Sequence, residues 1–351
     1  MMNEFLGRED VRVRNAKVNV SCPSNIALIK YWGKYAGQLP ANPSISYTLN
    51  HCRTDTEMVF EAGEAFGVQT FLSGKEEKGF SEKIENYFRS IEVYLPWITK
   101  GRYVVRTENT FPHSSGIASS ASGFGAIAKG LMYLEALFTN EDPQNVDLKK
   151  ASFLARLGSG SACRSLYDGL VVWGETSEVV GSSDYFAVPY PQEQVHSVFR
   201  HFNDWVLLIH EGQKSVSSSV GHGLMNTNPY AQRRFQEAKA NFVPMKAILK
   251  SGDLDGFITL VEHEALTLHA MMMMSHPAFI LMKTGTLEVI NRLWDFRKTT
   301  GLPLFFTLDA GANVHLLFPN DGREALIKDF IESELVPYTQ NGGVVKDEMI
   351  F

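Results

Sequence analysis

The feature that most constrains the fold is a change in hydrophobic periodicity along the chain. Between Pro229 and Thr300 the apolar residues recur at helical spacing, and strand-like alternation nearly disappears. Pro229 suits the start of a helix, whereas Gly252 and Gly301 suit helix ends. Strand-like and helical segments are mixed before this block, and strand-like runs return after it. The pattern predicts a fold of helices and strands with a helix-rich second half.

The strands and one helix can be located from the local pattern. Alternation over residues 17–22 predicts a half-buried strand, which Pro23 closes into a loop. Apolar residues at helical spacing predict an amphipathic helix that starts near Ser119 or Ser120. Short apolar runs predict further strands at 103–105, 170–173, 206–209, 304–307 and 314–318.

The chain has 351 residues, more than one typical domain, so we expect two domains. The stretch from Pro189 to Phe202 is polar and contains proline, which marks it as the candidate boundary. We therefore predict domains at 1–195 and 196–351.

Charge and cysteine usage exclude several classes of protein. A formal net charge of -6 provides no field that would attract nucleic acid, so an anionic ligand must be held locally. Cys22, Cys52 and Cys163 are too few and too scattered for a disulfide framework or a zinc site, which favours a reducing cytoplasm. The first 15 residues contain no hydrophobic signal core, and no apolar run is long enough to span a bilayer. We expect no association with a membrane.

The first candidate site is the serine- and glycine-rich stretch from Pro112 to Gly125, which reads PHSSGIASSASGFG. Glycine lets the backbone approach a phosphate, and serine hydroxyls and backbone N–H groups donate to its oxygens. The stretch lacks the Gly-Lys-Ser/Thr end of a Walker A loop and the glycine spacing of a dinucleotide-binding loop. Taken alone, it indicates either a phosphate-binding loop or a helix start packed tightly on a sheet.

The second candidate is the segment from Ser21 to Lys34, which reads SCPSNIALIKYWGK. Lys30 and Lys34 flank the pair Tyr31 and Trp32, so the segment could meet a phosphate and cover an apolar ligand surface. A strand end with solvated lysines would explain either lysine alone, but it explains the whole segment poorly.

The third candidate runs from Ala155 to Leu166 and reads ARLGSGSACRSL. Its serine–glycine turn offers N–H and hydroxyl donors to a phosphate-bearing group. Arg164 follows at the opening of a predicted helix and can form a two-pronged contact with a carboxylate, which lysine cannot reproduce. Cys163 is interpreted as a buried small residue, because no histidine partner is indicated.

Two shorter segments complete the set. Thr307 to Asn313 reads TLDAGAN and places Asp309 in a turn between two predicted strands, although a lone aspartate there is most often only a turn residue. Lys214 to Gly221 reads KSVSSSVG, a serine run of a kind that is common in loops.

Together these segments resemble the mevalonate diphosphate decarboxylase family of the galactokinase, homoserine kinase, mevalonate kinase and phosphomevalonate kinase (GHMP) superfamily. The string GSGSACRS is present without change, and SCPSNIALIKYWGK matches the family almost position by position. His113 departs from the family's phosphate loop and is interpreted as a loop or nucleotide-rim residue, and Ala312 replaces the usual proline after Asp309. The resemblance implies an α+β, two-lobed GHMP kinase fold. Its N-terminal lobe would be of the ribosomal-protein-S5-domain-2-like type, and its C-terminal lobe ferredoxin-like and helix-rich.

The resemblance also implies an activity. ATP would phosphorylate the tertiary 3-hydroxyl of mevalonate 5-diphosphate, and loss of phosphate and CO2 would then yield isopentenyl diphosphate. ATP and Mg²⁺ are the implied cofactors, and a homodimer is a family-level expectation. No acidic metal cage is evident in the sequence, so Mg²⁺ is expected to arrive with the nucleotide and to contact Ser119 or Ser120.

Residue roles follow from the same resemblance. Asp309 would take or orient the hydroxyl proton, Lys30 would give electrostatic support, and Arg164 and Asn25 would orient the substrate carboxylate. Substrate-binding residues would be Tyr31, Trp32, Lys34, Ser159, Gly160, Ser161, Ser218 and Ser219. Residues for ATP and Mg²⁺ would be Asn109, Ser114, Ser115, Gly116, Ala118, Ser119 and Ser120.

Other functions stay open at this point. One is decarboxylation of the monophosphate, and another is a small-molecule kinase of the mevalonate type that stops after phosphorylation. A third is a nucleotide-binding module without catalysis. Retention of Asp309, Arg164, Lys30 and the full serine–glycine turn argues against the kinase and against the non-catalytic module.

Overall fold

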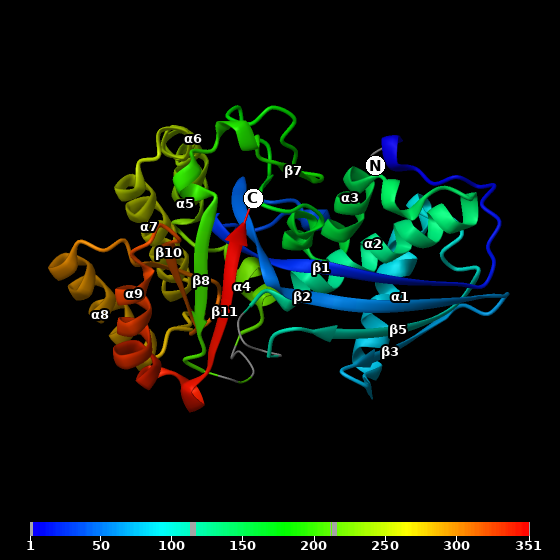
Figure 1. The fold of residues 1–351 in the computed structure, drawn as a ribbon. Helices are drawn as coiled ribbons and strands as arrows, with labels where there is room; N and C mark the ends of the chain where they lie inside the picture. Colours follow the sequence, from blue (N-terminus) through cyan, green and yellow to red (C-terminus); the bar gives the residue numbers. More distant parts are fainter. Residues whose placement is uncertain (1–2, 113–116, 211, 213–215, 351) are drawn as a thin grey trace.

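The protein forms an elongated molecule of two lobes, each built around its own sheet (Figure 1). The structure is a computed structural model, and it describes residues 3–112, 117–210, 212 and 216–350. The N-terminal lobe contains strands β1 (Ala16–Ile29), β2 (Ser44–Ala62), β3 (Gly67–Leu72), β4 (Lys75–Glu76), β5 (Gly101–Asn109), β6 (Leu170–Trp173) and β7 (Ala187–Pro189). Its helices are α1 (Lys78–Ile91), α2 (Ser119–Thr139) and α3 (Leu148–Gly158).

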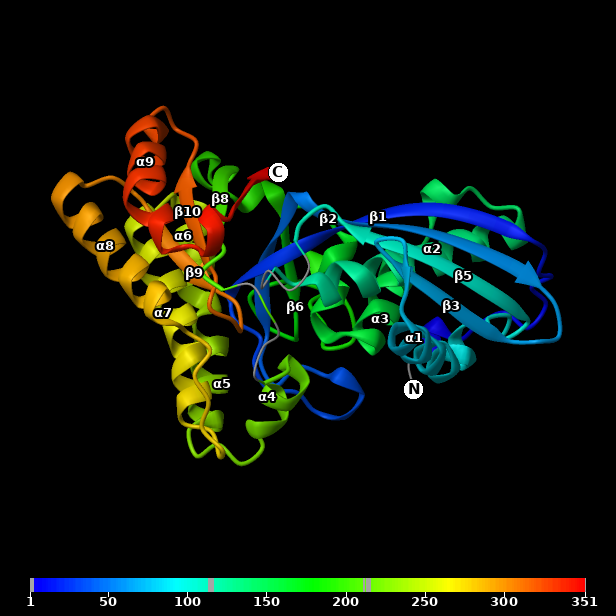
Figure 2. The same cartoon turned by 90° about the horizontal axis from the view of Figure 1, so that it is seen from below.

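The N-terminal sheet is organised around the long strand β2. In the described part of the chain its order is β4-β3-β5-β2-β6-β7, and β1 pairs with β2 in addition. Among the strands that the structure describes, only β3 and β5 pair in parallel. Helices α1, α2 and α3 pack on one face of this sheet, where Phe60, Phe88, Trp97, Tyr103 and Leu131 belong to one buried cluster (Figure 2). This packing fixes the N-terminal end of α2 at the centre of the molecule.

The C-terminal lobe combines a small antiparallel sheet with the helical block predicted from the sequence. Its strands are β8 (His201–Leu207), β9 (Phe305–Leu308), β10 (Val314–Pro319) and β11 (Val344–Ile350), in the order β11-β8-β10-β9. Its helices are α4 (Ser218–Leu224), α5 (Ala231–Ala240), α6 (Phe242–Ser251), α7 (Leu254–Met273), α8 (Thr284–Thr300) and α9 (Glu324–Phe330). The α+β class is therefore confirmed.

Several local predictions agree with the structure. Helix α2 begins at Ser119, and Gly252 and Gly301 end α6 and α8 with φ values of 81° and 70°. These left-handed backbones suit glycine. Helix α5 begins two residues after Pro229, as its position suggested.

The prediction that Pro23 ends the first strand is wrong. Strand β1 continues to Ile29, and Pro23 lies opposite Arg53 in the ladder with β2. The register shifts between Pro23 and Asn25, so a bulge accommodates the missing N–H of proline. The strand predicted at 206–209 also ends earlier, at Leu207.

Direct contacts join the two lobes. The buried carboxylate of Asp347, on β11, accepts backbone N–H groups of Asn50, His51 and Cys52 on β2 at 3.0, 2.9 and 2.6 Å. On the other side, the backbone N–H of Lys30 donates to Glu264 of α7 at 2.9 Å. The predicted boundary at 195/196 falls between β7 and β8, and it stays a prediction.

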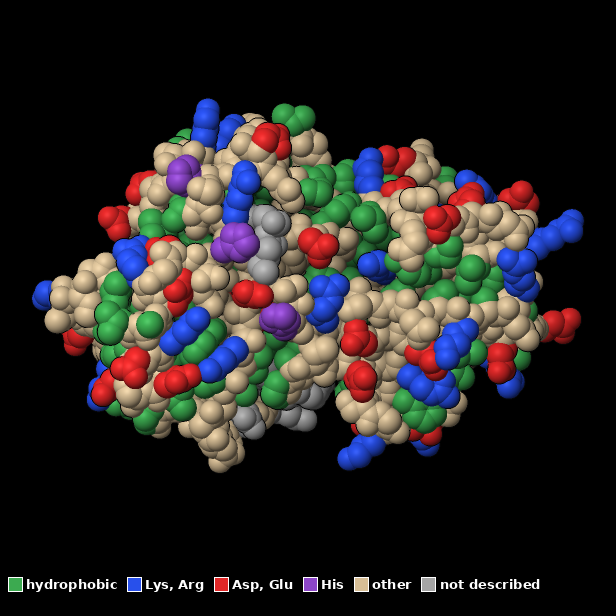
Figure 3. Space-filling model, viewed as in Figure 1, with side chains coloured by type: hydrophobic (Ala, Val, Ile, Leu, Met, Phe, Trp, Pro, Cys, Tyr) green, Lys and Arg blue, Asp and Glu red, His purple; other side chains and the backbone are tan. Residues whose placement is uncertain are grey.

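Two surface properties bear on the predicted partners. Acidic and basic side chains are interspersed on the face shown in Figure 3, without a large basic area. In the described residues, no helix is long and apolar enough to cross a membrane.

Candidate active site

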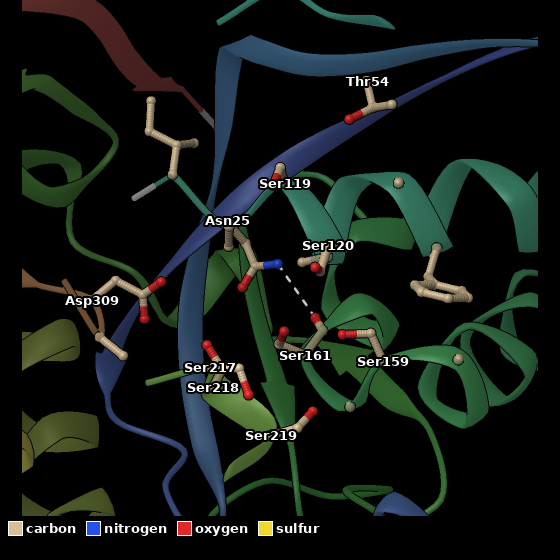
Figure 4. A pocket seen from close by; sticks show the side chains of 18 of the residues that line it. Asn25, Thr54, Ser119, Ser120, Ser159, Ser161, Ser217, Ser218, Ser219 and Asp309 are labelled. Carbon is tan, nitrogen blue, oxygen red and sulfur yellow. Dashed lines mark hydrogen bonds between the residues drawn. The ribbon is translucent and has the colours of Figure 1, made fainter. Parts of the chain in front are cut away.

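A cavity of about 710 Å³ lies where the two lobes meet. Its wall is formed by β1 and the segment after it, the start of α2, the turn after α3, the start of α4 and the loop after β9 (Figure 4). Among the predicted residues that the structure describes, those that line it are Asn25, Lys30, Tyr31, Trp32, Lys34, Asn109, Ala118, Ser119, Ser120, Ser159, Gly160, Ser161, Arg164, Ser218, Ser219 and Asp309. Ser114, Ser115 and Gly116, together with His113, lie outside the described residues.

Asp309 stands at the end of β9, in the turn that connects β9 to β10. The turn is held from within, because the N–H of Gly311 donates to the Asp309 carbonyl at 2.7 Å. It is also held from outside, since the Thr286 hydroxyl donates to the Ala312 carbonyl at 2.6 Å. The loop therefore has its own supports although Ala312 replaces a proline. Among the described residues that line the cavity, Asp309 is the only acidic one.

Lys30 is a buried cation that lines the same cavity as Asp309. Its side chain is 2% exposed, and its ammonium group donates to the Ala27 carbonyl at 2.5 Å. Burial lowers the pKa of Lys30 to about 8, although the nearby carboxylates of Asp309 and Glu264 act in the opposite direction. Lys30 is therefore a cation that the fold holds at an energetic cost beside Asp309.

Glu264 anchors the backbone of Lys30. Its carboxylate is fully buried and accepts both the Lys30 N–H and the two-pronged guanidinium of Arg234. Asn241 donates to the same carboxylate at 2.6 Å. Because an isolated buried charge is costly, these partners explain how a carboxylate can lie behind the cavity wall.

Arg164 is held by neutral partners and is 3% exposed. Its Nε donates to the side-chain oxygen Oδ1 of Asn25 at 3.1 Å, and its Nη1 donates to the Ser44 hydroxyl. The guanidinium also lies over the ring of Trp173, 5.9 Å from the centroid. In the described part of the chain no ion pair involves Arg164 or Lys30, so both cations are oriented by neutral groups and can act on an anionic ligand.

Asn25 connects Arg164 to the serine–glycine turn. While its oxygen accepts from Arg164, its amide nitrogen donates to the Ser165 hydroxyl at 2.8 Å and to the Ser161 carbonyl at 3.3 Å (Figure 4). The turn itself is short of space: a Cβ on Gly160 would lie 2.8 Å from Trp173 and 2.9 Å from the Tyr31 hydroxyl. Glycine is thus required where the turn approaches these rings. The predicted helix at Arg164 is a 3₁₀ helix over 160–166.

Cys163 plays no part in this chemistry. Burial raises the pKa of its thiol to about 12, and the thiol donates to the Gly160 carbonyl at 3.0 Å. A protonated, buried thiol agrees with its interpretation as a small core residue.

The described serine residues that line the cavity come from three places. Figure 4 shows Ser119 and Ser120 at the start of α2, Ser159 and Ser161 in the turn, and Ser217–Ser219 at the start of α4. Asp309 lies on the opposite side of the view from Ser159. Serine hydroxyl groups therefore line the cavity on several sides, and the carboxylate of Asp309 lines it on one side.

Several lining residues were not identified from the sequence. Lys83 of α1 lines the cavity, as do the apolar side chains of Phe80, Ile84 and Leu72, and burial lowers the pKa of Lys83. Thr54 links two elements, since its hydroxyl contacts Asn109 and Ser122 at 2.7 and 2.6 Å. His222 and Leu268 also line the cavity and have no distinctive sequence context, whereas Ser217 lies in the serine run from which only Ser218 and Ser219 were selected.

Tyr31, Trp32 and Lys34 follow β1 and line the cavity, and the rings of Tyr31 and Trp32 pack against α4. The rings of Tyr31 and Trp32 both lie 4.4 Å from the imidazole of His222. Tyr31 also packs on Trp173 at 4.7 Å. Lys34 donates to Gln38 at 2.8 Å and is only partly buried.

Comparison with known proteins now identifies the family. Residues 22–187 match the diphosphomevalonate decarboxylase-like N-terminal domain, and residues 205–347 match the mevalonate 5-diphosphate decarboxylase C-terminal domain. Diphosphomevalonate decarboxylase of Schizosaccharomyces pombe is 30% identical over 341 residues, which are 88% of this chain and 80% of that relative. The chain belongs to the diphosphomevalonate decarboxylase family. The enzyme of the same name from Ganoderma lucidum is 29% identical over 90% of this chain and 80% of its own.

Solved structures of this family have the same fold. Mevalonate diphosphate decarboxylase from Staphylococcus aureus superposes with a TM-score of 0.81 at 27% identity and covers 96% of each chain. The enzyme from Enterococcus faecalis gives a TM-score of 0.79 at 26% identity, over 96% of this chain and 99% of that one. The two-lobed GHMP kinase fold expected from the motifs is thereby confirmed.

Proposed function

We propose that this protein catalyses the ATP-dependent decarboxylation of mevalonate 5-diphosphate to isopentenyl diphosphate, with release of ADP, phosphate and CO2. The observation that carries the proposal is the convergence of Asp309, Lys30 and Arg164 on one cavity. Family membership supports it, because the relatives are named for this activity. A structure described as MDDEF in complex with MVAPP, AMPPCP and magnesium, at a TM-score of 0.79, supports ATP and Mg²⁺ as cofactors.

The cavity suits a substrate that carries both a diphosphate and a carboxylate. Hydroxyl and backbone donors of Ser159–Ser161 and of Ser218 and Ser219 are suited to the diphosphate. Arg164 and Asn25 are suited to the carboxylate, since the guanidinium is oriented by neutral groups and forms no ion pair in the described part of the chain. Contacts to the diphosphate and to the carboxylate would together position the tertiary carbon that lies between these two groups.

The nucleotide is assigned to the part of the cavity that the start of α2 and helix α1 line. Ser119 and Ser120 lie at the N-terminal end of α2, whose 21 residues supply a favourable dipole for phosphate. The apolar side chains of Phe80 and Ile84 with Lys83 form a wall that could cover the base.

The residues also fit a magnesium ion carried by the nucleotide. No group of three or more His, Cys, Asp or Glu side chains that could hold a metal occurs among the described residues, and the cavity wall offers hydroxyl oxygens and one carboxylate. These donors suit a magnesium ion that is coordinated mainly by phosphate oxygens and water. Ser119 or Ser120 would provide the contact from the protein. When bound, Mg²⁺ would neutralise charge on the phosphates during transfer.

The chemical step follows from the positions of three charges. Asp309 accepts the proton of the tertiary hydroxyl as its oxygen attacks the γ-phosphorus of ATP, and ADP leaves. Lys30 stabilises the charge that develops on the transferred group. The C–O bond to the new phosphate then breaks, and phosphate leaves with that electron pair. The C–C bond to the carboxylate also breaks, and its electron pair forms the new C=C double bond as CO2 is released. Arg164 and Asn25 hold the departing CO2 in line until it leaves.

The deciding experiment compares three substrates with purified protein, ATP and Mg²⁺. ADP, phosphate and CO2 should form in equal amounts with mevalonate 5-diphosphate and not with mevalonate. Turnover of the 5-phosphate alone would support the monophosphate decarboxylase, and ADP without CO2 would support a kinase. No ADP from any of the three, despite a thermal shift with ATP, would support a module without catalysis.

The location in the cell and the oligomeric state stay predictions. Cys22, Cys52 and Cys163 are all free and buried, which agrees with the reducing cytoplasm proposed from the sequence. The homodimer is proposed from the family alone, and sedimentation at several concentrations would test it.

A further inference from the structure

His222 is a buried residue of the cavity wall that none of the predicted roles uses. It lies in α4, the helix that carries Ser218 and Ser219, and is 8% exposed. Its imidazole packs against the rings of Tyr31 and Trp32, with both centroids at 4.4 Å and the ring planes tilted by 34° and 36°. Gly221, the preceding residue, leaves no room for a side chain, because a Cβ there would lie 2.7 Å from Trp32. The packing thus holds this ring against the segment that follows β1.

One hydrogen bond determines the tautomer of His222. The backbone N–H of Gly33 donates to Nδ1 at 2.9 Å, so Nδ1 must carry a lone pair. The proton of a neutral imidazole must therefore be on Nε2. Gly33 is itself fixed, with φ of 95° and the ring of Phe235 filling the place of a side chain. The orientation of the imidazole is thus set by backbone that cannot easily shift.

The remaining Nε2–H belongs to a side chain that lines the cavity. No hydrogen bond to Nε2 is made by the described residues. Nε2 of His222 is not among the fully buried polar atoms without a partner, so this nitrogen is not completely covered by the protein. Its neighbours are Lys34, whose charge acts on the imidazole, and Tyr31, whose hydroxyl borders Gly160 of the serine–glycine turn.

From this geometry we infer that His222 is a further specificity-determining residue, which donates its Nε2–H to an oxygen of the substrate's diphosphate. The inference rests on the proposed function for the identity of the ligand. His222 would thus add an uncharged donor to the hydroxyl groups of Ser218 and Ser219 on the same helix, α4.

The imidazole is neutral near neutral pH, so it can act there as an uncharged donor. Burial lowers the pKa of His222 to about 3, and the positive charge of Lys34 acts in the same direction, while Asp309 opposes them. A second cation beside Lys34 would be costly in this buried place. The neutral tautomer gives the donor without that cost.

Two substitutions separate the two ring nitrogens. In His222→Asn the side-chain oxygen can replace Nδ1 and keep the bond from Gly33, but nothing replaces the Nε2–H. In His222→Gln the amide nitrogen can reach the position of Nε2. Exposed His201, at the start of β8, gives the matched control His201→Asn.

Loss of a hydrogen bond to a charged group should raise KM for mevalonate 5-diphosphate about ten- to hundredfold in the Asn variant. KM for ATP should stay near the wild-type value, and the Gln variant should recover most of the loss. The control should match the wild type. An unchanged KM for the diphosphate, or a rise in KM for ATP alone, would overturn the inference.

A binding measurement keeps this test independent of catalysis. Inorganic pyrophosphate, measured by calorimetry, should bind the Asn variant more weakly by a similar factor. If the wild type releases no CO2 but this difference persists, the proposed function fails and the role of His222 stands. If the Asn variant does not fold, His222→Phe replaces it, because phenylalanine keeps the stacking but has no donor; equal pyrophosphate binding by the Phe and Gln variants would overturn the inference.

Discussion

Replacing Lys30 with methionine should stabilise the protein while it removes activity. Lys30 is 2% exposed, and burial lowers its pKa from 10.5 to about 8 even with Asp309 and Glu264 nearby. By linkage, this difference corresponds to about 3 kcal/mol of folding free energy that the charged ammonium costs near neutral pH. Methionine has a similar shape and no charge, so Lys30→Met should recover part of that amount, with about 3 kcal/mol as the ceiling.

The pH dependence of this gain has a definite sign. The pKa of Lys30 is lower in the folded protein than in the unfolded chain, so the unfolded chain binds the proton more tightly. The cost is complete below about pH 8 and disappears as the pH rises toward 10.5. The advantage of the methionine variant should therefore fall from about 3 kcal/mol at pH 7 to about 1 kcal/mol at pH 9.5.

Urea unfolding at both pH values measures the effect. The matched control is Lys250→Met, on the exposed side of α6, which should change stability little and equally at the two pH values. ADP release should be lost in Lys30→Met and retained in the control. A methionine variant that is less stable than the wild type at pH 7, or whose difference from it does not shrink at pH 9.5, would refute the reasoning.

Three further substitutions test the reacting groups and the turn. Asp309→Asn should lower kcat on the order of a hundred- to ten-thousandfold with nearly unchanged binding, and near-normal ADP release would contradict its role. Arg164→Lys should cripple CO2 release because a point charge cannot form the two-pronged contact, so a lysine variant with good turnover would exclude the carboxylate clamp. Gly160→Ala should raise KM for the diphosphate, since a Cβ would come within 2.9 Å of both Trp173 and the Tyr31 hydroxyl. Unchanged KM would mean that the turn can move away from these rings at little cost.

The sequence predicted those parts of the site whose pattern is local. The start of α2 at Ser119 and the glycine ends of α6 and α8 depend on residues within one turn of helix, so they could be predicted correctly. The turn that holds Asp309 was also expected, because apolar runs on both sides marked strands.

Features that depend on distant partners could not be predicted. The bulge at Pro23 is fixed by pairing with Arg53 on β2, 30 residues later, and local chemistry suggested a loop instead. His222 shows the same limit. Nothing near it in the sequence separates it from an ordinary core histidine, and its tautomer depends on Gly33, 189 residues away.

The convergence of Asp309 and Arg164 follows from how the lobes are joined. Arg164 is oriented through Asn25 on β1, and β1 leads directly to Lys30, whose backbone is anchored by Glu264 of α7. Helix α7 also contacts the Asp309 loop, because His269 lies 3.1 Å from the Asp309 carbonyl. Strand β1 and helix α7, which contact each other at Lys30 and Glu264, therefore position both Arg164 and Asp309. Neither lobe alone contains both charges, so a cut between them should abolish activity even if each half folded.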